Sequence, residues 1–322
     1  MTKNTHFKDT DNGTISETDL KFSDISIVIP VLNDPNGIKD TLNSLVNQEY
    51  PAYHFEIIVS DNGSIDTTLA VINEYIEKYP KLIRVVIEDS IQSSYAARNK
   101  GIEAAKGAVI AFIDADMSVD KDWLTKINQS LKEDRWDYLA CGLEIYLKNK
   151  TIYEIYDKIT GFPIRSYVYD SHFAPTCCLV VRRIVFENLG LFDSRLISSG
   201  DYEFGNRVYI SGQTLFFNPN IVMRHPARSS FSELYKKSFR IGRGLLQLSF
   251  YYPERYHRWY RTIVNPLNYL PDIPWKFVMS KNGKRIWDEL SFGDKISIYF
   301  LNWLLKLAKI LGYCYESYSQ RR

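Results

Sequence analysis

Short apolar segments alternate with helix-like segments through the first third of the chain, and this alternation limits the fold more than any other feature. Four runs rich in β-branched residues are predicted to form buried strands, at residues 25–30, 55–60, 82–87 and 108–113. Helical segments separate them. This order predicts a parallel sheet with helices on its faces. Ligands of such sheets bind beyond the carboxyl ends of the strands.

The second predicted strand ends in a polar turn, Asp61-Asn62-Gly63-Ser64, with Asp66 close behind. Gly63 allows a tight turn, and the carboxylate of Asp61 is able to accept hydrogen bonds from a base or a ribose. The alternative is an ordinary connection between a strand and a helix, capped by Asp66.

The fourth predicted strand ends in Asp114-Ala115-Asp116. Two carboxylates one residue apart, raised out of an apolar strand, are suited to hold a hard divalent cation against a diphosphate. A nucleotide sugar requires this because its leaving diphosphate gains negative charge, which a metal stabilises without proton transfer. A helix cap or a solvated turn is the alternative, although Ser118 and Asp120 are available to cap the next helix.

Three further residues are candidates because of their chemistry. Arg98, on a predicted helix, could reach a base edge or a diphosphate oxygen, although a surface salt bridge is the commoner role of such an arginine. Asp201 follows Gly200 near a predicted helix start, where a carboxylate stays ionised and is able to take a proton from an acceptor hydroxyl. Helix capping is a compatible role for it. A neutral His225 could complete a metal site, although a lone histidine is more often structural.

Five segments of the chain, in this order, resemble the family 2 glycosyltransferases. They are Ile29-Pro30-Val31-Leu32-Asn33-Asp34, Val59-Ser60-Asp61-Asn62-Gly63-Ser64-Ile65-Asp66, Ala97-Arg98-Asn99-Lys100-Gly101, Phe112-Ile113-Asp114-Ala115-Asp116, and Gly190-Leu191-Phe192-Asp193 followed by Gly200-Asp201-Tyr202-Glu203. The resemblance implies an α/β fold of the GT-A type, with a Rossmann-like, mainly parallel sheet flanked by helices and a C-terminal helical extension. It also implies an inverting, metal-dependent enzyme.

The resemblance implies roles for individual residues as well. The donor-binding positions are matched by Pro30, Asn33, Asp61, Gly63, Arg98 and Asp114. The metal-binding positions, for Mn²⁺ or Mg²⁺, are matched by Asp116 and His225. Asp201 matches the catalytic base, and Glu203 is a second candidate because Gly200 departs from the usual acid pair. Arg240 and Arg243 lie in a basic stretch that resembles one following the catalytic core.

Three parts are predicted along the chain. Residues 1–23 are polar and read as a loose tail without a signal peptide. Residues 24–230 form the GT-A domain, with its nucleotide-binding half at about 24–118 and its acceptor half at about 119–230. Residues 231–322 form a helical, basic and aromatic extension.

The C-terminal part combines a basic patch with an apolar helix. Between positions 224 and 261 nine lysines and arginines, interleaved with aromatic residues, stand against two acids. Such a patch suits a phosphate-bearing or membrane-surface partner, with a solvated basic face as the alternative. The last helix, around residues 296–313, is predicted to place Phe300, Leu304, Leu307 and Leu311 opposite Asn302, Lys306, Lys309 and Tyr313. Each central lysine would cost ~2.5–3.5 kcal/mol in a bilayer, so an interfacial or a core-packed helix is favoured over a span.

The four cysteines show neither a disulfide framework nor metal-ligand spacing, which favours reduced core residues in a cytoplasmic protein. The basic patch and the last helix together favour peripheral contact with the cytoplasmic face of the membrane. Cys177 and Cys178 are expected to point to opposite faces of a strand at residues 176–182. The net charge of +2 gives no indication of a nucleic-acid partner.

The predicted reaction is the transfer of one sugar from a nucleotide sugar to a hydroxyl of a glycan or lipid-linked glycan, in the synthesis of a surface polysaccharide or glycoconjugate. A UDP-sugar is the commonest donor in the family. Transfer of a single sugar is favoured because the chain has no Gln-x-x-Arg-Trp motif and no run of spanning helices. A polyprenyl-phosphate sugar synthase and an inactive nucleotide-sugar-binding scaffold are the alternatives. No Gly-x-Gly-x-x-Gly follows the first strand, which disfavours a dehydrogenase.

Overall fold

The computed structural model describes residues 22–256, 264–278 and 281–320, and most of the predicted tail lies outside these ranges. The strands are β1 (Ile25–Val31), β2 (Phe55–Asp61), β3 (Ile83–Ile87), β4 (Val109–Phe112), β5 (Ser118–Val119), β6 (Tyr138–Tyr146), β7 (Leu179–Arg182) and β8 (Leu215–Pro226). They form one sheet in the order β3-β2-β1-β4-β7-β6-β8-β5. The first four of these neighbours are parallel, β7 runs antiparallel to both β4 and β6, and β8 is parallel to β6. The predicted α/β fold with a mainly parallel sheet is confirmed.

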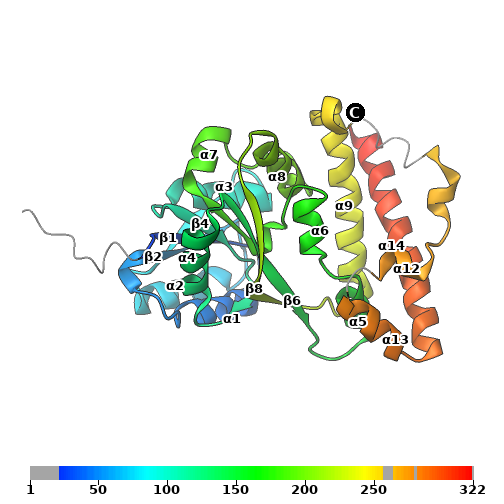
Figure 1. Ribbon diagram of the computed structural model, residues 1–322, viewed down its shortest axis with the longest axis horizontal. Coiled ribbons are helices and arrows are strands. Elements are labelled where there is room, and N and C mark those ends of the chain that lie inside the picture. The colour runs from blue at the N-terminus through cyan, green and yellow to red at the C-terminus, as the bar shows by residue number, and fades with distance from the viewer. Residues whose placement is uncertain (1–21, 257–263, 279–280, 321–322) are drawn as a thin grey trace, which may run out of the picture.

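Helices cover the sheet and continue beyond it (Figure 1). They are α1 (Pro35–Leu45), α2 (Thr68–Lys78), α3 (Ser94–Ala104), α4 (Trp123–Asp134), α5 (Ile152–Thr160), α6 (Ile164–Tyr169), α7 (Arg183–Leu189), α8 (Gly200–Ile210), α9 (Phe231–Tyr251), α10 (Pro253–Tyr256), α12 (Pro274–Phe277), α13 (Lys281–Glu289) and α14 (Phe292–Ser319). Short 3₁₀ turns are η2 (Ala52–His54), η3 (Thr176–Cys178) and η4 (Pro266–Tyr269).

The central strands are buried on both faces, as their continuous apolar sequences predict. Ile27, Val28 and Ile29 of β1 are fully buried, and α3 packs on β1, β2 and β3. A side-chain cap marks the transition from β1 to α1. Asp34 caps α1 by accepting a hydrogen bond from the Gly37 amide at 2.8 Å. The carboxyl ends of β1, β2 and β4 therefore meet at one edge of the sheet, where the acidic turns lie.

The prediction of a single strand at residues 176–182 was wrong in its first half. The Cys178 amide donates a hydrogen bond to the Pro175 carbonyl at 3.1 Å, which closes the 3₁₀ turn η3 before β7 begins. Cys177 and Cys178 consequently do not alternate across a strand, although both are buried.

The C-terminal helices form a layer beside the sheet, in which α9 and α14 run along each other (Figure 1). Glycines bring the two backbones into contact. A methyl group on Gly242 of α9 would overlap the Lys309 carbonyl oxygen of α14, and one on Gly312 of α14 would overlap the Phe239 carbonyl oxygen of α9. A second apolar cluster, separate from the core of the sheet, joins α5, α9, α13 and α14.

Residues of the predicted polar stripe of α14 face the protein, where they lie beside the buried apolar residues Ile298, Leu301 and Leu305. Asn302 is buried and accepts a hydrogen bond from the Tyr156 hydroxyl at 3.0 Å, and Tyr313 is also buried. The apolar stripe faces outward, with exposed fractions of 52% for Phe300, 46% for Leu304 and 53% for Leu311. Among the described helices, none has the length and apolar character needed to cross a bilayer.

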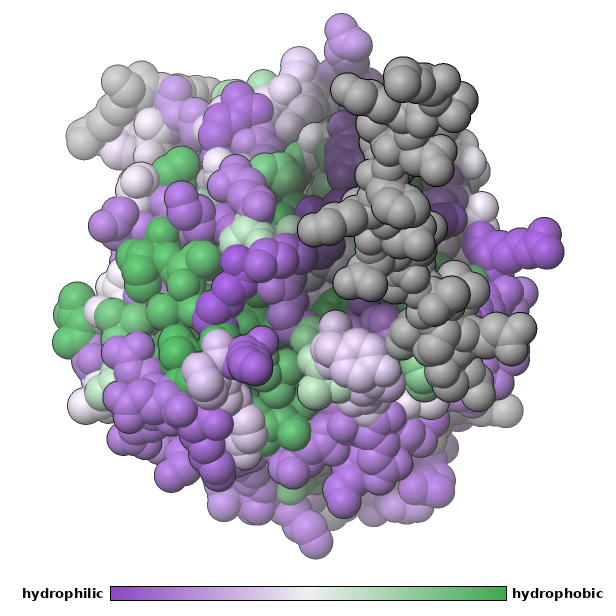
Figure 2. Space-filling view, turned by 90° about the vertical axis from the view of Figure 1, so that its left-hand side faces the viewer, coloured by the Kyte–Doolittle hydropathy of each residue, from purple (hydrophilic) through white to green (hydrophobic). Residues whose placement is uncertain are grey.

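The opposite end of the molecule has a different surface. Figure 2 views it from the side of β2 and α2, where hydrophilic side chains cover most of the face and hydrophobic ones gather in one area. Tyr53 of η2 is an isolated exposed aromatic residue of the N-terminal half, with an exposed fraction of 73%.

Candidate active site

A cavity of about 1140 Å³ lies beyond the carboxyl ends of β1 and β4 and extends to the C-terminal helices. It brings together predicted residues from distant parts of the chain, namely Pro30, Arg98, Asp114, Asp201, His225, Arg240 and Arg243. The other predicted residues, namely Asn33, Asp61, Gly63, Asp116 and Glu203, do not line this cavity. The size suits a nucleotide sugar together with part of an acceptor, since drug-sized ligands occupy pockets of ~300–1000 Å³.

The turn after β2 presents a free carboxylate oxygen. Asp61 Oδ2 accepts hydrogen bonds from the amides of Gly63 at 3.1 Å and Ser64 at 2.9 Å. Gly63 adopts a φ of 83°, which favours glycine. Asp61 Oδ1 is buried and has no hydrogen-bond partner in the described part of the chain. A buried acceptor without a partner is costly, which makes this oxygen a candidate acceptor for a base N–H or a ribose hydroxyl. Asp61 itself does not line the cavity, whereas the adjacent Asn62 does.

Asn33 holds this turn in place. Its side-chain oxygen accepts a hydrogen bond from the Ile65 amide at 2.9 Å, and its own amide donates to Ser64 Oγ at 2.9 Å. Asn33 thus connects the end of β1 to the turn after β2. In this position it supports the shape of the turn, while Pro30 at the end of β1 lines the cavity directly.

Arg98 and Asp114 form a pair at the cavity wall. Arg98 is buried on α3, and one of its terminal nitrogens lies 2.6 Å from Asp114 Oδ1. The surface salt bridge weighed for Arg98 is therefore wrong, because the guanidinium lies inside the protein. Arg98 Nε has no hydrogen-bond partner among the described residues, and the Asp114 side chain remains partly exposed to the cavity.

Asp116 and His225 face each other from the end of β4 and the end of β8. Asp116 Oδ1 lies 3.9 Å from His225 Nε2. Two ligands about 2.1 Å from one Mg²⁺ lie at most about 4.2 Å apart, so both side chains are within reach of a shared ion. His225 Nδ1 lies 2.6 Å from the Pro226 carbonyl oxygen. A proton on Nδ1 satisfies this contact and leaves Nε2 unprotonated, which is the form that binds a metal.

Charge and burial at this pair also fit a cation. Burial raises the pKa of the Asp116 carboxyl, and nearby Asp114 raises it further while His225 lowers it. A divalent ion would relieve this unfavourable burial of negative charge. Within the described ranges, no three His, Cys, Asp or Glu side chains meet in a group able to hold an ion. Asp116 and His225 would therefore need the oxygens of a bound diphosphate and water to complete the coordination.

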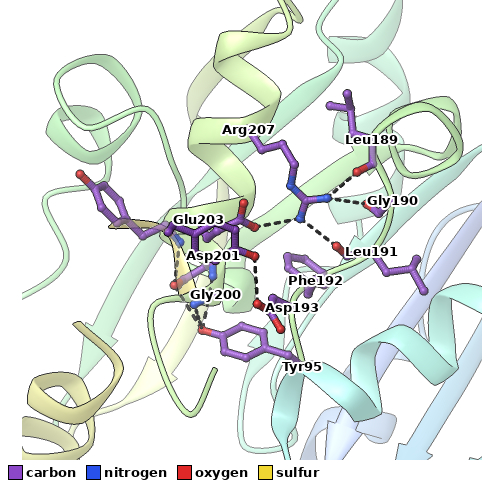
Figure 3. Close-up of polar contacts among 12 residues, drawn as sticks. Tyr95, Leu189, Gly190, Leu191, Phe192, Asp193, Gly200, Asp201, Glu203 and Arg207 are labelled. Atoms are coloured by element: carbon purple, nitrogen blue, oxygen red, sulfur yellow. Dashed lines mark hydrogen bonds and ion pairs between the residues drawn. The ribbon is translucent and has the colours of Figure 1, made fainter. Parts of the chain in front are cut away.

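Asp201 is the second residue of α8 and lies on the cavity wall (Figure 3). Its Oδ1 accepts a hydrogen bond from the Tyr202 amide at 3.0 Å and lies 3.3 Å from the Tyr95 hydroxyl, which donates to it. The Tyr95 oxygen also accepts a hydrogen bond from the Gly200 amide at 2.9 Å. Ser199 occupies the capping position of α8, so the suggested capping by Asp201 was wrong.

The surroundings of Asp201 change the protonation that its position near a helix start would predict. Burial raises the pKa of the Asp201 carboxyl, and the Tyr202 amide and the Arg98 charge only partly oppose this effect. A carboxylate with a raised pKa is a stronger base than an exposed one. Sequence patterns gave no indication of Tyr95, because its contact with Asp201 spans more than a hundred residues.

Glu203 has a different environment on the same helix. Its side chain is 1% exposed and pairs with Arg207 at 2.9 Å and with Arg255 at 3.4 Å. Arg207 in turn donates hydrogen bonds to the carbonyl oxygens of Leu189, Gly190 and Leu191 (Figure 3). The Glu203–Arg207 pair therefore connects α8 to the loop that follows α7. Of the two acids at the start of α8, Asp201 lines the cavity and Glu203 does not.

Basic side chains line the cavity from the C-terminal side. Arg240 and Arg243 extend from α9, and Arg243 Nε lies 2.7 Å from Glu316 of α14. Lys237 of α9 pairs with the buried Asp157 at 3.1 Å. Lys309 of α14 also reaches the cavity, a position that no local sequence pattern predicts.

Two protein-family models match the chain. Glycosyl transferase family 2 matches residues 26–190, and Glycosyl transferase family group 2 matches residues 109–312. The chain is 37% identical over 225 residues to glycosyltransferase AglE of Haloferax volcanii, which covers 70% of this chain and 73% of the relative. It is 28% identical over 230 residues to the dolichyl N-acetyl-α-D-glucosaminyl phosphate 3-β-D-2,3-diacetamido-2,3-dideoxy-β-D-glucuronosyltransferase of Methanococcus voltae, covering 68% of this chain and 71% of that protein.

Solved structures share the fold at low sequence identity. The mannosyltransferase PcManGT of Pyrobaculum calidifontis, in complex with GDP-Man and Mn²⁺, superposes with a TM-score of 0.63 at 15% identity over 92% of this chain and 88% of that chain. S. aureus TarS 1–349 in complex with UDP-GlcNAc superposes with a TM-score of 0.54 at 16% identity over 92% of both chains.

Proposed function

The chain belongs to the family 2 glycosyltransferases and has their GT-A fold, and from this premise we propose that it transfers a single sugar, with inversion, from a nucleotide sugar to a hydroxyl of a lipid-linked glycan. The observation that carries the proposal is the position of Asp201. This enclosed carboxylate lies on the wall of the same cavity as the Arg98–Asp114 pair, so a base and a donor site face one volume.

The donor would bind at the edge where the parallel strands end. Asp61 Oδ1, which is buried without a partner, is the acceptor for a donor group of the base or the ribose. Arg98 and Asp114 would then contact the ribose and the diphosphate from α3 and the end of β4. A UDP-sugar is the proposed donor, since TarS, a structural neighbour, has been solved in complex with UDP-GlcNAc.

Asp116 and His225 would hold a Mn²⁺ or Mg²⁺ ion against the diphosphate. Such an ion neutralises charge on the leaving group. The fit rests on the 3.9 Å spacing and on the free Nε2 of His225. The structural neighbour PcManGT has been solved with both GDP-Man and Mn²⁺.

Asp201 would take the proton of the acceptor hydroxyl as its oxygen attacks the anomeric carbon from the face opposite the diphosphate. Tyr95 positions this carboxylate, because its hydroxyl contacts both the Asp201 carboxylate and the Gly200 amide. The space around Gly200 is also fixed, since a methyl group there would lie 2.8 Å from the Tyr95 ring.

Two other functions can be distinguished from the proposed transfer to a hydroxyl. A polyprenyl-phosphate sugar synthase would use an acceptor that is already ionised and would not need the base. A scaffold would bind the donor without turnover. The enclosed Asp201, whose pKa is raised, favours an acceptor hydroxyl. The Methanococcus voltae relative, which is named for transfer to a dolichyl sugar phosphate, supports a lipid-linked acceptor.

Calorimetric titration of the protein with UDP, GDP, CDP and dTDP tests the donor site. We expect one nucleotide, UDP, to bind with Mn²⁺ present and to lose about tenfold or more of its affinity in EDTA, because the ion contributes several kcal/mol of charge stabilisation. The folded state is checked by circular dichroism in each buffer. If the folded protein binds none of the four nucleotides under either condition, the proposed transferase function fails.

The outward stripe of α14 is the proposed contact with the membrane. The segment around η4 lies against this helix, because Trp303 Nε1 donates to the Tyr269 carbonyl at 2.8 Å and Lys306 pairs with Asp272 at 2.9 Å. Leu267 and Leu270 of this segment are exposed apolar residues, as Phe300 and Leu304 of α14 are. Aromatic and aliphatic side chains exposed together are typical of a helix that lies at a lipid interface.

Vesicle binding tests this surface. Wild-type protein is expected to sediment with phosphatidylcholine–phosphatidylglycerol vesicles, and F300S/L304S to bind about tenfold or more weakly, since burial of each side chain contributes ~1.5–3 kcal/mol. The control Y53S removes an exposed aromatic residue from the other half of the protein and should bind as wild type does. Equal sedimentation of F300S/L304S and wild type would exclude this surface as the contact.

A further inference from the structure

The cavity is much more basic than its donor-binding end requires. Among the described residues, seven lysines and arginines line it, against the two aspartates Asp114 and Asp201. The seven are Arg98, Arg195, Arg228, Lys237, Arg240, Arg243 and Lys309. Five of them have a carboxylate partner within the protein, supplied by Asp114, Asp193, Asp157 or Glu316. Arg240 and Lys309 have neither an ion pair nor a hydrogen bond with the described residues.

Backbone packing fixes the position of Lys309. The Lys309 carbonyl oxygen touches Gly242 of α9, and Gly312, almost one turn further along α14, touches the Phe239 carbonyl oxygen. Arg240 lies between these two contact points on α9. The helix contact therefore fixes the backbones of both residues at the cavity, which the half-buried Lys309 and the exposed Arg240 both line. Burial lowers the pKa of the Lys309 ammonium, so a bound anion would stabilise its charged form.

We propose that Arg240 and Lys309 form an anion subsite that binds the phosphate of the acceptor, next to the sugar that receives the transferred residue. This inference rests on the proposed transfer to a lipid-linked acceptor and specifies where its phosphate lies. A guanidinium and an ammonium without partners among the described residues are suited to the phosphate of a lipid-linked sugar, whose two non-bridging oxygens share one negative charge.

The two faces of α14 connect this subsite to the membrane. Lys309 faces the cavity, whereas Leu304 and Leu311 lie on the opposite, exposed face of the same helix. An α-helix with its side chains is ~10–12 Å across. A phosphate held by Lys309 is thus about one helix diameter from the surface proposed to contact lipid, which suits a head group whose chain stays in the bilayer.

The position of the subsite distinguishes it from the donor's diphosphate. The donor side is formed by residues at the strand ends, where Arg98 pairs with Asp114 and Asp116 faces His225. Arg240 and Lys309 come instead from α9 and α14, which follow the last strand of the sheet. Loss of these cations should therefore weaken acceptor binding without changing nucleotide affinity.

The test is calorimetric titration with geranyl phosphate, in the presence of UDP and Mn²⁺, of wild type, K309M and R240Q. We expect K309M and R240Q each to lower the affinity for geranyl phosphate by about tenfold or more and to leave that for UDP unchanged. K309M removes a desolvated, unpaired charge, so its melting temperature should match or exceed that of wild type. The matched control is K306M, which removes a lysine one turn away that pairs with Asp272 and does not line the cavity.

The outcomes separate this subsite from the proposed transfer itself. Unchanged affinity of K309M for geranyl phosphate, or no binding of geranyl phosphate by wild type that binds UDP, would overturn the subsite and leave the transfer reaction standing. A parallel loss of UDP affinity in K309M would assign the cations to the donor diphosphate instead. Inorganic phosphate binding as tightly as geranyl phosphate would indicate a site for free phosphate and would also overturn the assignment. Absence of nucleotide binding by wild type would count against the transfer reaction.

Discussion

Replacing Asp201 with asparagine is expected to lower kcat by about 10²–10⁴-fold and to leave nucleotide affinity unchanged, because general-base catalysis contributes this much and asparagine cannot take the proton. The amide retains the shape of the side chain and an oxygen to accept the hydrogen bonds from Tyr202 and Tyr95. Initial rates with a lipid-linked sugar acceptor, together with calorimetric UDP affinity, measure the two quantities separately.

The pH dependence should identify the same group. Burial raises the folded-state pKa of Asp201, and only its deprotonated form accepts the acceptor's proton. The rate of wild type is therefore expected to rise with pH through this raised pKa and to fall as the carboxyl becomes protonated at lower pH. The residual rate of D201N should lack this dependence.

Glu203 provides the internal comparison for Asp201. Its carboxylate pairs with two arginines in the protein interior, so E203Q is expected mainly to lower the melting temperature. If D201N retained full activity while folded E203Q lost it, the base would be Glu203. If both retained full activity, an acceptor that is already ionised would be favoured, as in a polyprenyl-phosphate sugar synthase.

Replacing Asp116 with alanine is expected to remove the effect of metal on nucleotide binding and to lower kcat/KM by about 10³-fold. A metal that stabilises a leaving group contributes several kcal/mol, and each 1.36 kcal/mol corresponds to about a tenfold change in rate. In D116A, UDP affinity with Mn²⁺ should equal its affinity in EDTA. His225 alone would then hold the ion, and a single protein ligand is not sufficient for tight binding.

D122A is the control for D116A. Asp122 lies six residues further on and pairs with Lys126 at 3.0 Å on the surface of α4. D122A should keep the wild-type difference between Mn²⁺ and EDTA. A D116A protein that still showed this difference in full would contradict the assignment of Asp116 as a metal ligand.

The parallel half of the fold could be predicted because its signals are local. Four apolar runs became β1 to β4, and the acidic turns at Asp61 and Asp114 followed from where those strands end. Such features depend on a few consecutive residues. The positions of these acids at one edge then follow from the parallel order of the strands.

Other features depend on contacts between distant segments, and the sequence offers no local pattern for them. Tyr95 meets Asp201 only because α3 and α8 pack together at the cavity. The helical wheel of α14 separated its two faces correctly but could not say which faces inward. Partners on other elements decide this: Tyr156 of α5 bonds to Asn302, Arg243 of α9 pairs with Glu316, and the inward-facing Ile298, Leu301 and Leu305 join the second apolar cluster. Without them, burial of the apolar stripe would be the ordinary expectation.

The glycine contacts between α9 and α14 have a consequence for protein engineering. Gly242 and Gly312 let the two backbones touch. A larger side chain at either position would overlap the backbone of the other helix and push the two helices apart. A sequence change on one of these helices must therefore be compatible with the residues of the other helix at the contact. A chimera intended to change which acceptor is used would have to exchange α9 and α14 together, and a swap of α14 alone should give a chain that assembles poorly.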